Sequence, residues 1–226
     1  MAGVSNNALM KKEENIKSSN GLDIHGIRNT GDVFWNLSTE DLLACAQERN
    51  EGVLTSTGAL SCTTGEHTGR SPKDKFIVKD ETTADKVDWG SVNQEMSPES
   101  FAKLREDQLA YLEGKELFVR DATAGAEHSL PIRVVNESAW HNLFAKHMFL
   151  RPEAETLKNH LPKFTVIQTP GFEANPEVHG TRSKTFIVAN FTEGLILIGG
   201  TSYAGEIKKS IFSVLNFLYP CLLYTS

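Results

Sequence analysis

Gly194-Leu-Ile-Leu-Ile-Gly-Gly-Thr-Ser-Tyr-Ala-Gly205 contains the strand and the turn that decide the fold. The apolar, β-branched run that ends in paired glycines predicts a buried strand. After the turn, residues 206–219 predict a helix that ends at Pro220. Its apolar residues recur at helical spacing and would face the core, at Ile207, Ile211, Val214, Leu215 and Leu218.

A strand, a glycine turn and a helix N-terminus together form a place where free backbone N–H groups meet anions. Lys208 and Lys209 lie in the expected first turn of the helix, where the helix dipole disfavours cations. The pair therefore indicates a bound anion or a metal-bridged ligand. Two other interpretations stay open: Glu206 can cap the same N–H groups without a ligand, and most Lys-Lys pairs are solvated.

A second loop, Thr64-Gly-Glu-His-Thr-Gly-Arg-Ser-Pro-Lys-Asp-Lys-Phe-Ile-Val78, places Arg70 after two glycines. Glycine lets backbone approach a ligand closely, and a guanidinium grips a carboxylate or phosphate with two parallel hydrogen bonds. The loop thus predicts a clamp for a small, charged substrate; the alternative is an ordinary turn with solvated basic residues. It is not a P-loop, because the spacing is one residue short and Arg replaces Lys.

Four segments in this order resemble the ATP-dependent phosphoenolpyruvate carboxykinase family: residues 64–75, 117–122, 139–152 and 199–209. The resemblance covers about residues 31–220. It implies an α/β fold, with a mixed sheet and flanking helices, as the N-terminal substrate domain of such an enzyme. The family decarboxylates oxaloacetate and phosphorylates the enolate with ATP to give phosphoenolpyruvate, ADP and CO2, a step of gluconeogenesis.

The resemblance also implies roles for four residues. Arg70 would bind the substrate carboxylate or the departing CO2, and Tyr203 would lie beside the substrate. Lys209 would contact substrate and the γ-phosphate of ATP and would ligate Mn²⁺, with Lys208 as a helper; Mg²⁺ would accompany the nucleotide. A lysine ligates metal only through its neutral amine, so this role requires a pKa well below about 10.4.

The resemblance sets domain boundaries as well. We expect residues 1–20 to be poorly ordered, residues 21–220 to form the substrate-binding domain, and residues 221–226 to be a non-native tail. The family's P-loop nucleotide domain, with the remaining metal ligands, does not occur in the 226 residues. We therefore expect this chain to be an N-terminal fragment that is inactive alone. The alternative is a non-catalytic module, derived from the enzyme, that binds dicarboxylates or other anions.

Composition limits the function classes. A formal charge of −6 argues against nucleic-acid binding, so the expected partner is a small molecule. Cys45, Cys62 and Cys221 are too few and too scattered for a disulfide framework or a zinc site. No apolar stretch is long enough to span a bilayer, and the N-terminus lacks a secretory pattern. We therefore expect a cytoplasmic protein without a membrane partner.

Pattern and propensity also predict the remaining elements. Helices are expected at residues 38–51, 98–113 and 138–149, and strands at 53–62, 76–78, 116–121, 133–136, 164–168, 185–189 and 195–198. Residues 80–97 and 168–182 are polar and are expected to be rich in loops. Polar surroundings predict surface positions for four histidines: His25, His128, His160 and His179.

Overall fold

The computed structural model describes residues 15–219. Within it the chain divides into two compact units, each built from two separate stretches of sequence. Unit 1 comprises residues up to 62 together with 114–163, and unit 2 comprises 63–113 together with the residues from 164 onward. None of the described helices is long and apolar enough to cross a membrane.

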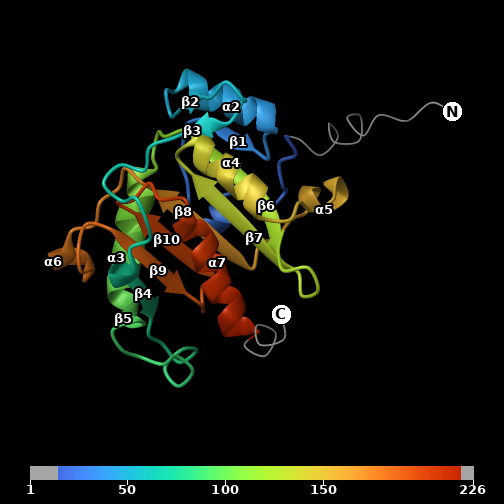
Figure 1. Ribbon diagram of the computed structural model, residues 1–226. Helices are drawn as coiled ribbons and strands as arrows, with labels where there is room; N and C mark the ends of the chain where they lie inside the picture. Colours follow the sequence, from blue (N-terminus) through green and yellow to red (C-terminus); the bar gives the residue numbers. More distant parts are fainter. Residues whose placement is uncertain (1–14, 220–226) are drawn as a thin grey trace. The chain divides into compact units, whose positions relative to one another are not determined.

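Unit 1 is a small mixed sheet with helices (Figure 1). Its strands run in the order β1-β6-β7, with β1 parallel to β6 and β6 antiparallel to β7. The elements are β1 (Val33–Trp35), α2 (Thr39–Glu48), β2 (Val53–Leu54), β3 (Leu60–Ser61), β6 (Leu117–Ala124), β7 (Leu130–Asn136), α4 (Ala139–Met148), α5 (Ala154–Lys158) and a 3₁₀ turn (Asp23–His25).

Helices α2 and α4 lie side by side over the strands of unit 1 (Figure 1). Ser38 caps α2, because its hydroxyl accepts from the Asp41 N–H at 2.9 Å. The helices meet the sheet through a fully buried apolar cluster of Leu42, Ala46, Phe118 and Ala139. This burial fixes both helices on one face of the unit 1 strands.

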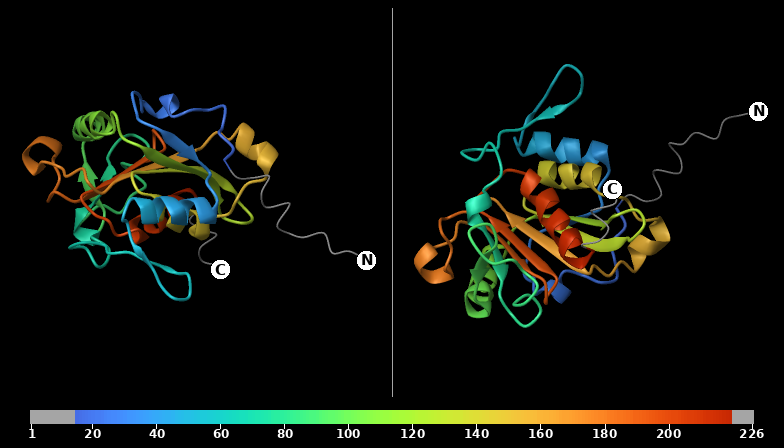
Figure 2. Two further views of the ribbon diagram at one scale, coloured as in Figure 1. Left: turned by 90° about the horizontal axis from the view of Figure 1, so that it is seen from above. Right: turned by 60° about the horizontal axis from the view of Figure 1, so that its bottom comes forward.

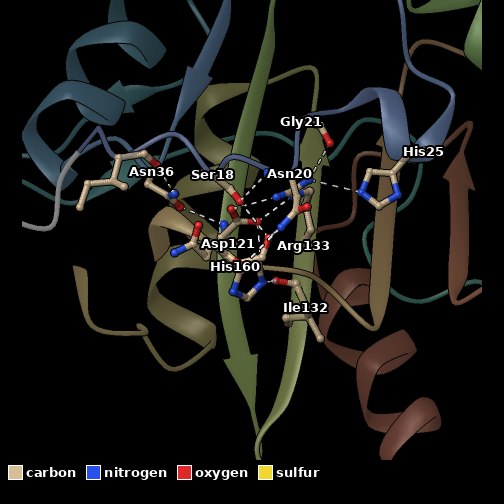
Figure 3. A network of polar contacts seen from close by, with 11 residues as sticks. Ser18, Asn20, Gly21, His25, Asn36, Asp121, Ile132, Arg133 and His160 are labelled. Carbon is tan, nitrogen blue, oxygen red and sulfur yellow. Dashed lines mark hydrogen bonds and ion pairs between the residues drawn. The ribbon is translucent and has the colours of Figure 1, made fainter. Parts of the chain in front are cut away.

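A buried ion pair lies at the centre of unit 1 (Figure 3). Arg133 on β7 donates to both carboxylate oxygens of Asp121 on β6, at 2.7 and 3.1 Å, and both side chains are fully buried. The guanidinium also donates to Gly21 O at 3.0 Å and stacks 4.8 Å from the Trp35 ring. Removing one partner of such a pair typically costs about 3–5 kcal/mol, because the other charge stays buried.

The residues before the 3₁₀ turn, 15–20, are hydrogen-bonded to the rest of unit 1 (Figure 3). Ser18 is buried and donates its hydroxyl hydrogen to His160 O at 2.8 Å, and Asn36 donates to Ile16 O at 2.8 Å. Residues 15–20 therefore have defined contacts, although the sequence predicted poor order for residues 1–20. Residues 1–14 and the predicted tail at 221–226 lie outside the described part.

Unit 2 is a five-stranded mixed sheet in the order β8-β10-β9-β4-β5. Strand β10 is parallel to β8 and antiparallel to β9, and β4 is parallel to both β9 and β5. The elements are a 3₁₀ turn (Pro72–Asp74), β4 (Lys75–Val78), β5 (Gln94–Met96), α3 (Pro98–Tyr111), β8 (Phe164–Thr169), α6 (Pro176–His179), β9 (Phe186–Asn190), β10 (Leu195–Gly199) and α7 (Gly205–Leu218).

Helices α3 and α7 cover opposite faces of the unit 2 sheet (Figure 2). Three of the five residues that the helical spacing predicted to face the core are buried, namely Ile207, Ile211 and Val214, whereas Leu215 is half-buried and Leu218 is exposed. On α3 the buried Gln108 amide donates to Thr169 Oγ1 at 2.8 Å and to Ile198 O at 3.2 Å. Covering both faces explains why the β10 strand is continuously apolar.

The predicted fold class, a mixed α/β arrangement with flanking helices, is confirmed in both units. One local prediction is wrong. The strand predicted at 53–62 is a hairpin, because Gly58 at φ +82° turns the chain between β2 and β3. The segments predicted to be rich in loops each contain one short element: β5, a polar edge strand whose Glu95 pairs with Lys79, lies in 80–97, and helix α6 lies in 168–182.

The predicted surface positions of the histidines are wrong for three of the four. His25, His160 and His179 are buried, whereas His128 is exposed. Each buried ring has a polar partner that offsets its burial: His160 Nε2 donates to Ile132 O at 3.0 Å, and His179 Nε2 donates to Asp107 Oδ2 at 2.9 Å. Their partners are distant in sequence, so polar flanking residues gave no sign of them.

Burial of His160 makes unit 1 sensitive to acid. Burial lowers the pKa of His160 below its ordinary value, although the Asp121 charge partly opposes this. A histidine with a lowered folded-state pKa stabilises the fold above its unfolded pKa of roughly 6.5 and loses that contribution as the pH falls. In urea unfolding between about pH 5 and 7.5, His160→Gln should flatten the pH dependence relative to wild type. His128→Gln is the control that should not; parallel curves for wild type and His160→Gln would contradict the prediction.

Candidate anion-binding cleft

Strand pairing brings three distant loops of unit 2 to one edge of its sheet. Gly199 at the end of β10 pairs with Phe186 at the start of β9, because these strands are antiparallel. Ile187 of β9 pairs in turn with Lys75 at the start of the parallel strand β4. The loop before β4, the loop before β9 and the turn after β10 therefore meet. They are residues 64–74, 181–185 and 200–204, called here the arginine loop, the threonine loop and the glycine turn.

The glycine turn needs glycine for two reasons. Gly200 has φ +65°, a conformation that side chains disfavour, and a Cβ there would lie 2.6 Å from Lys184 O. A Cβ on Gly199 would lie 2.4 Å from the Phe186 ring. The paired glycines thus let the end of β10 pass directly against β9 and the threonine loop.

The arginine loop is anchored to the threonine loop by Asp74. This carboxylate is buried and accepts from Arg182 and from the Ser183 hydroxyl, at 2.9 and 2.8 Å. Arg182 also donates to Lys73 O at 3.1 Å. The Ser-Pro-Lys-Asp stretch therefore has a structural task, which is to fix the loop just before β4.

A histidine joins the same loops at a second point. Thr185 donates its hydroxyl hydrogen to Gly200 O at 2.9 Å, so its oxygen accepts from His67 Nε2, also at 2.9 Å. His67 Nδ1 then accepts from the Ser71 hydroxyl at 3.3 Å. The sequence assigned His67 no role, because nothing in the chain order links it to Thr185.

Glu206 connects the arginine loop to α7. Its carboxylate is buried, and Oε1 accepts from the Ser71 N–H at 2.7 Å. No side chain caps the helix at its N-cap residue, Ala204. The structure therefore does not show the capping of the helix by Glu206 that the sequence left open as an alternative.

The lysine pair lies slightly further along the helix than expected. Because α7 begins at Gly205, Lys208 ends the first turn and Lys209 begins the second. The dipole effect fades within the first turn, so the argument from an unfavourable lysine pair is weaker than the sequence suggested. Lys208 is exposed, whereas Lys209 is half-buried with Nζ 4.4 Å from the Phe212 ring centre.

A cleft of about 860 Å³ lies between the arginine loop and α7, within unit 2. Its basic end is lined by Arg70, Lys73, Lys75, Lys209 and the Glu206 carboxylate; Phe191, Phe212 and Phe217 line the rest together with polar residues. An acidic chain of net charge −6 thus concentrates cations in one concave place. Such a cleft suits a small anion, because cations gathered in a concave place raise the local concentration of anions.

The charges in the cleft perturb one another. Lys75 donates to Ser213 Oγ at 2.9 Å, and burial, with the Lys209 and Arg70 charges, lowers the pKa of Lys75. Burial raises the pKa of Glu206, although the Ser71 N–H and the Arg70 and Lys75 charges oppose this. A bound anion would relieve the repulsion among the cations, which favours binding over an empty cleft.

The structure brings together two of the four predicted site residues. Arg70, which is exposed, and Lys209 line the same cleft. Lys208 and Tyr203 do not line it; the Tyr203 ring covers Gly205, where a Cβ would meet it at 2.5 Å. Lys75 and Glu206 also line the cleft, although neither of them was predicted from the sequence to have a role in ligand binding. Their only sign in the sequence was their proximity to Arg70 and Lys209 in the two motifs.

The described residues do not provide a complete metal site. Within residues 15–219 no three His, Cys, Asp or Glu side chains are grouped to hold an ion. Lys209 offers one nitrogen donor, and a divalent cation needs several ligands. These residues alone therefore do not fit the divalent metal that the resemblance implies.

Unit 2 is thus a mixed α/β unit whose cleft gathers basic residues of the arginine loop and α7. The sequence model of the phosphoenolpyruvate carboxykinase family matches residues 31–224, and the chain belongs to this family. Similar proteins include phosphoenolpyruvate carboxykinase (ATP) of Geotalea uraniireducens, 49% identical over 92% of this chain and 40% of the relative. That of Brevibacillus brevis is 56% identical over 83% of this chain and 36% of the relative.

The chain thus spans about two fifths of the length of the curated relatives it matches, including one from Moorella thermoacetica that is 51% identical over 91% of this chain and 39% of the relative. The family uses ATP and a divalent metal. The matched region includes both the arginine loop and the glycine turn.

Replacing Gly200 should disrupt the cleft. Gly200→Ala places a Cβ at positive φ and against the Lys184 carbonyl, so we expect a loss of about 1–3 kcal/mol in the free energy of unfolding. Gly69→Ala is the matched control in the other loop, because a Cβ there meets nothing within 4 Å. Urea unfolding measures both; equal stability of the two variants would contradict this account of the turn.

Proposed function

We propose that this chain supplies the substrate-binding part of an ATP-dependent phosphoenolpyruvate carboxykinase. That enzyme converts oxaloacetate and ATP to phosphoenolpyruvate, ADP and CO2. The observation that carries the proposal is the shared cleft, which Arg70 of the arginine loop and Lys209 of α7 both line. Both substrate and product are small anions with carboxylates, which matches the charge and the size of this end of the cleft.

Arg70 is proposed to hold the carboxylate of the substrate or the departing CO2. Its guanidinium can make two parallel hydrogen bonds to a carboxylate, which fixes orientation as well as charge. Loss of CO2 leaves an enolate, so negative charge develops on an oxygen during the reaction. Cations already placed in the cleft stabilise such charge without reorganisation.

Lys209 is proposed to contact the substrate and the γ-phosphate and to donate one ligand to Mn²⁺, with Mg²⁺ accompanying ATP. Tyr203 is proposed to lie beside the substrate, and Lys208 to assist. Tyr203 lies on the glycine turn, where its N–H donates to Thr201 Oγ1 at 3.1 Å and its carbonyl oxygen accepts from the Glu206 N–H at 3.1 Å. The proposed setting is the cytoplasm. The alternative function is a non-catalytic module that binds dicarboxylates or other anions in the same cleft.

Phosphoenolpyruvate binding tests the proposed site. Titration calorimetry of the 226-residue chain should show binding that weakens about 10- to 100-fold in Arg70→Met, because a charge-assisted pair is lost. Lys79→Met is the control: Lys79 belongs to unit 2 but pairs with Glu95 outside the cleft. Equal affinity of wild type and Arg70→Met would refute the assignment of Arg70.

Turnover tests the expectation that the chain is inactive alone. Phosphoryl transfer needs a phosphate cradle and its metals, and the 226 residues contain no P-loop sequence. We therefore expect no ATP-dependent formation of phosphoenolpyruvate by the purified chain with oxaloacetate, Mn²⁺ and Mg²⁺. Formation of phosphoenolpyruvate above a protein-free blank would show that this expectation is wrong.

A further inference from the structure

Arg70 depends on its neighbours for its orientation. The side chain is exposed, so the position of its backbone decides where the guanidinium can reach. The next residue, Ser71, makes two hydrogen bonds: its N–H donates to Glu206 on α7 at 2.7 Å, and its hydroxyl donates to His67 within the same loop at 3.3 Å. These bonds fix the backbone next to Arg70.

The hydrogen bond from the Ser71 N–H to Glu206 requires the burial of a charged group. A carboxylate that is 95% buried loses most of its hydration, and the raised pKa of Glu206 records that penalty. A neutral acceptor would satisfy the same Ser71 N–H with a smaller penalty. The position nevertheless holds an acid, one helical turn before Lys209 and on the helix that carries it.

The His67 contact completes a frame around Ser71. His67 links Ser71 to Thr185, and Thr185 links onward to Gly200 O. The arginine loop is thus tied to the glycine turn through His67 and to the first turn of α7 through Glu206. Neither residue touches the other in this network, so each forms an independent anchor on the same loop.

We propose that Glu206 and His67 are positioning residues that together hold the arginine loop against α7, so that Arg70 and Lys209 face the same anion. This inference rests on the proposed function of the cleft. Glu206 acts through its hydrogen bond to the Ser71 N–H and does not itself meet the anion, which its charge would repel. The two anchors thus hold the arginine loop and α7 in one site of fixed geometry.

A pair of substitutions at Glu206 distinguishes positioning from charge. Gln keeps an oxygen that accepts from the Ser71 N–H, whereas Ala removes it. Phosphoenolpyruvate affinity, measured by calorimetry, should fall about tenfold in Glu206→Ala, as expected for one lost hydrogen bond to a charged group. Glu206→Gln should bind at least as tightly as wild type, because the acceptor remains and a negative charge is gone. A merely structural role would not give rescue of affinity by Gln.

Amide hydrogen exchange provides a readout that does not need a ligand. Exchange at the Ser71 N–H should be at least about tenfold faster in Glu206→Ala than in wild type and nearly unchanged in Glu206→Gln. His67→Ala should also speed exchange at Ser71 and weaken phosphoenolpyruvate binding. Glu173→Ala is the matched control, because Glu173 is an exposed acid of unit 2 that pairs with Lys184 and does not line the cleft.

The outcomes separate the anchors from the function. Normal affinity and normal Ser71 exchange in a folded Glu206→Ala would overturn the proposal, as would an equal loss of affinity in Gln and Ala variants. If Glu206→Ala does not fold, His67→Ala and Glu206→Gln decide by the same two measurements. If wild type binds no phosphoenolpyruvate, the proposed function fails, while faster Ser71 exchange in the Ala variants still supports the anchors.

Discussion

The antiparallel pairing of β9 with β10, next to the parallel pairing of β9 with β4, is the constraint on which the cleft depends. Reversing one strand places the end of β10 beside the beginnings of β9 and β4. The arginine loop then shares one edge of the unit 2 sheet with the threonine loop and the glycine turn, both of which lie more than 100 residues further along the chain. Their hydrogen bonds, through Asp74, Thr185 and Glu206, follow from that proximity.

The cleft holds several cations close together beside one buried carboxylate. Burial, and after it repulsion from the Lys209 and Arg70 charges, lowers the pKa of Lys75. One buried carboxylate, Glu206, offsets part of this repulsion while it holds the arginine loop. A bound anion would relieve this repulsion, which favours binding of small anions. Because hydrogen bonds already hold the loops in place, little conformational entropy would be lost on binding.

The apolar patterns of β10 and α7 could be predicted from sequence because burial on both faces leaves a direct trace in residue type. Arg70 and Lys209 were found through motifs in the chain. By contrast, the β5 edge strand is polar, and the buried rings of His160 and His179 depend on partners far away in sequence. The same holds for His67 and Thr185, so this anchor of the site was not visible until strand pairing was known.

A crystal structure of the chain with phosphoenolpyruvate would test the central claim most directly. The account predicts the ligand at the basic end of the cleft, with its carboxylate or phosphate oxygens about 2.7–3.0 Å from both the Arg70 guanidinium and Lys209 Nζ. The Glu206–Ser71 hydrogen bond should be intact in the complex. A ligand bound elsewhere on the protein, or one that contacts only Arg70 or only Lys209, would contradict the account.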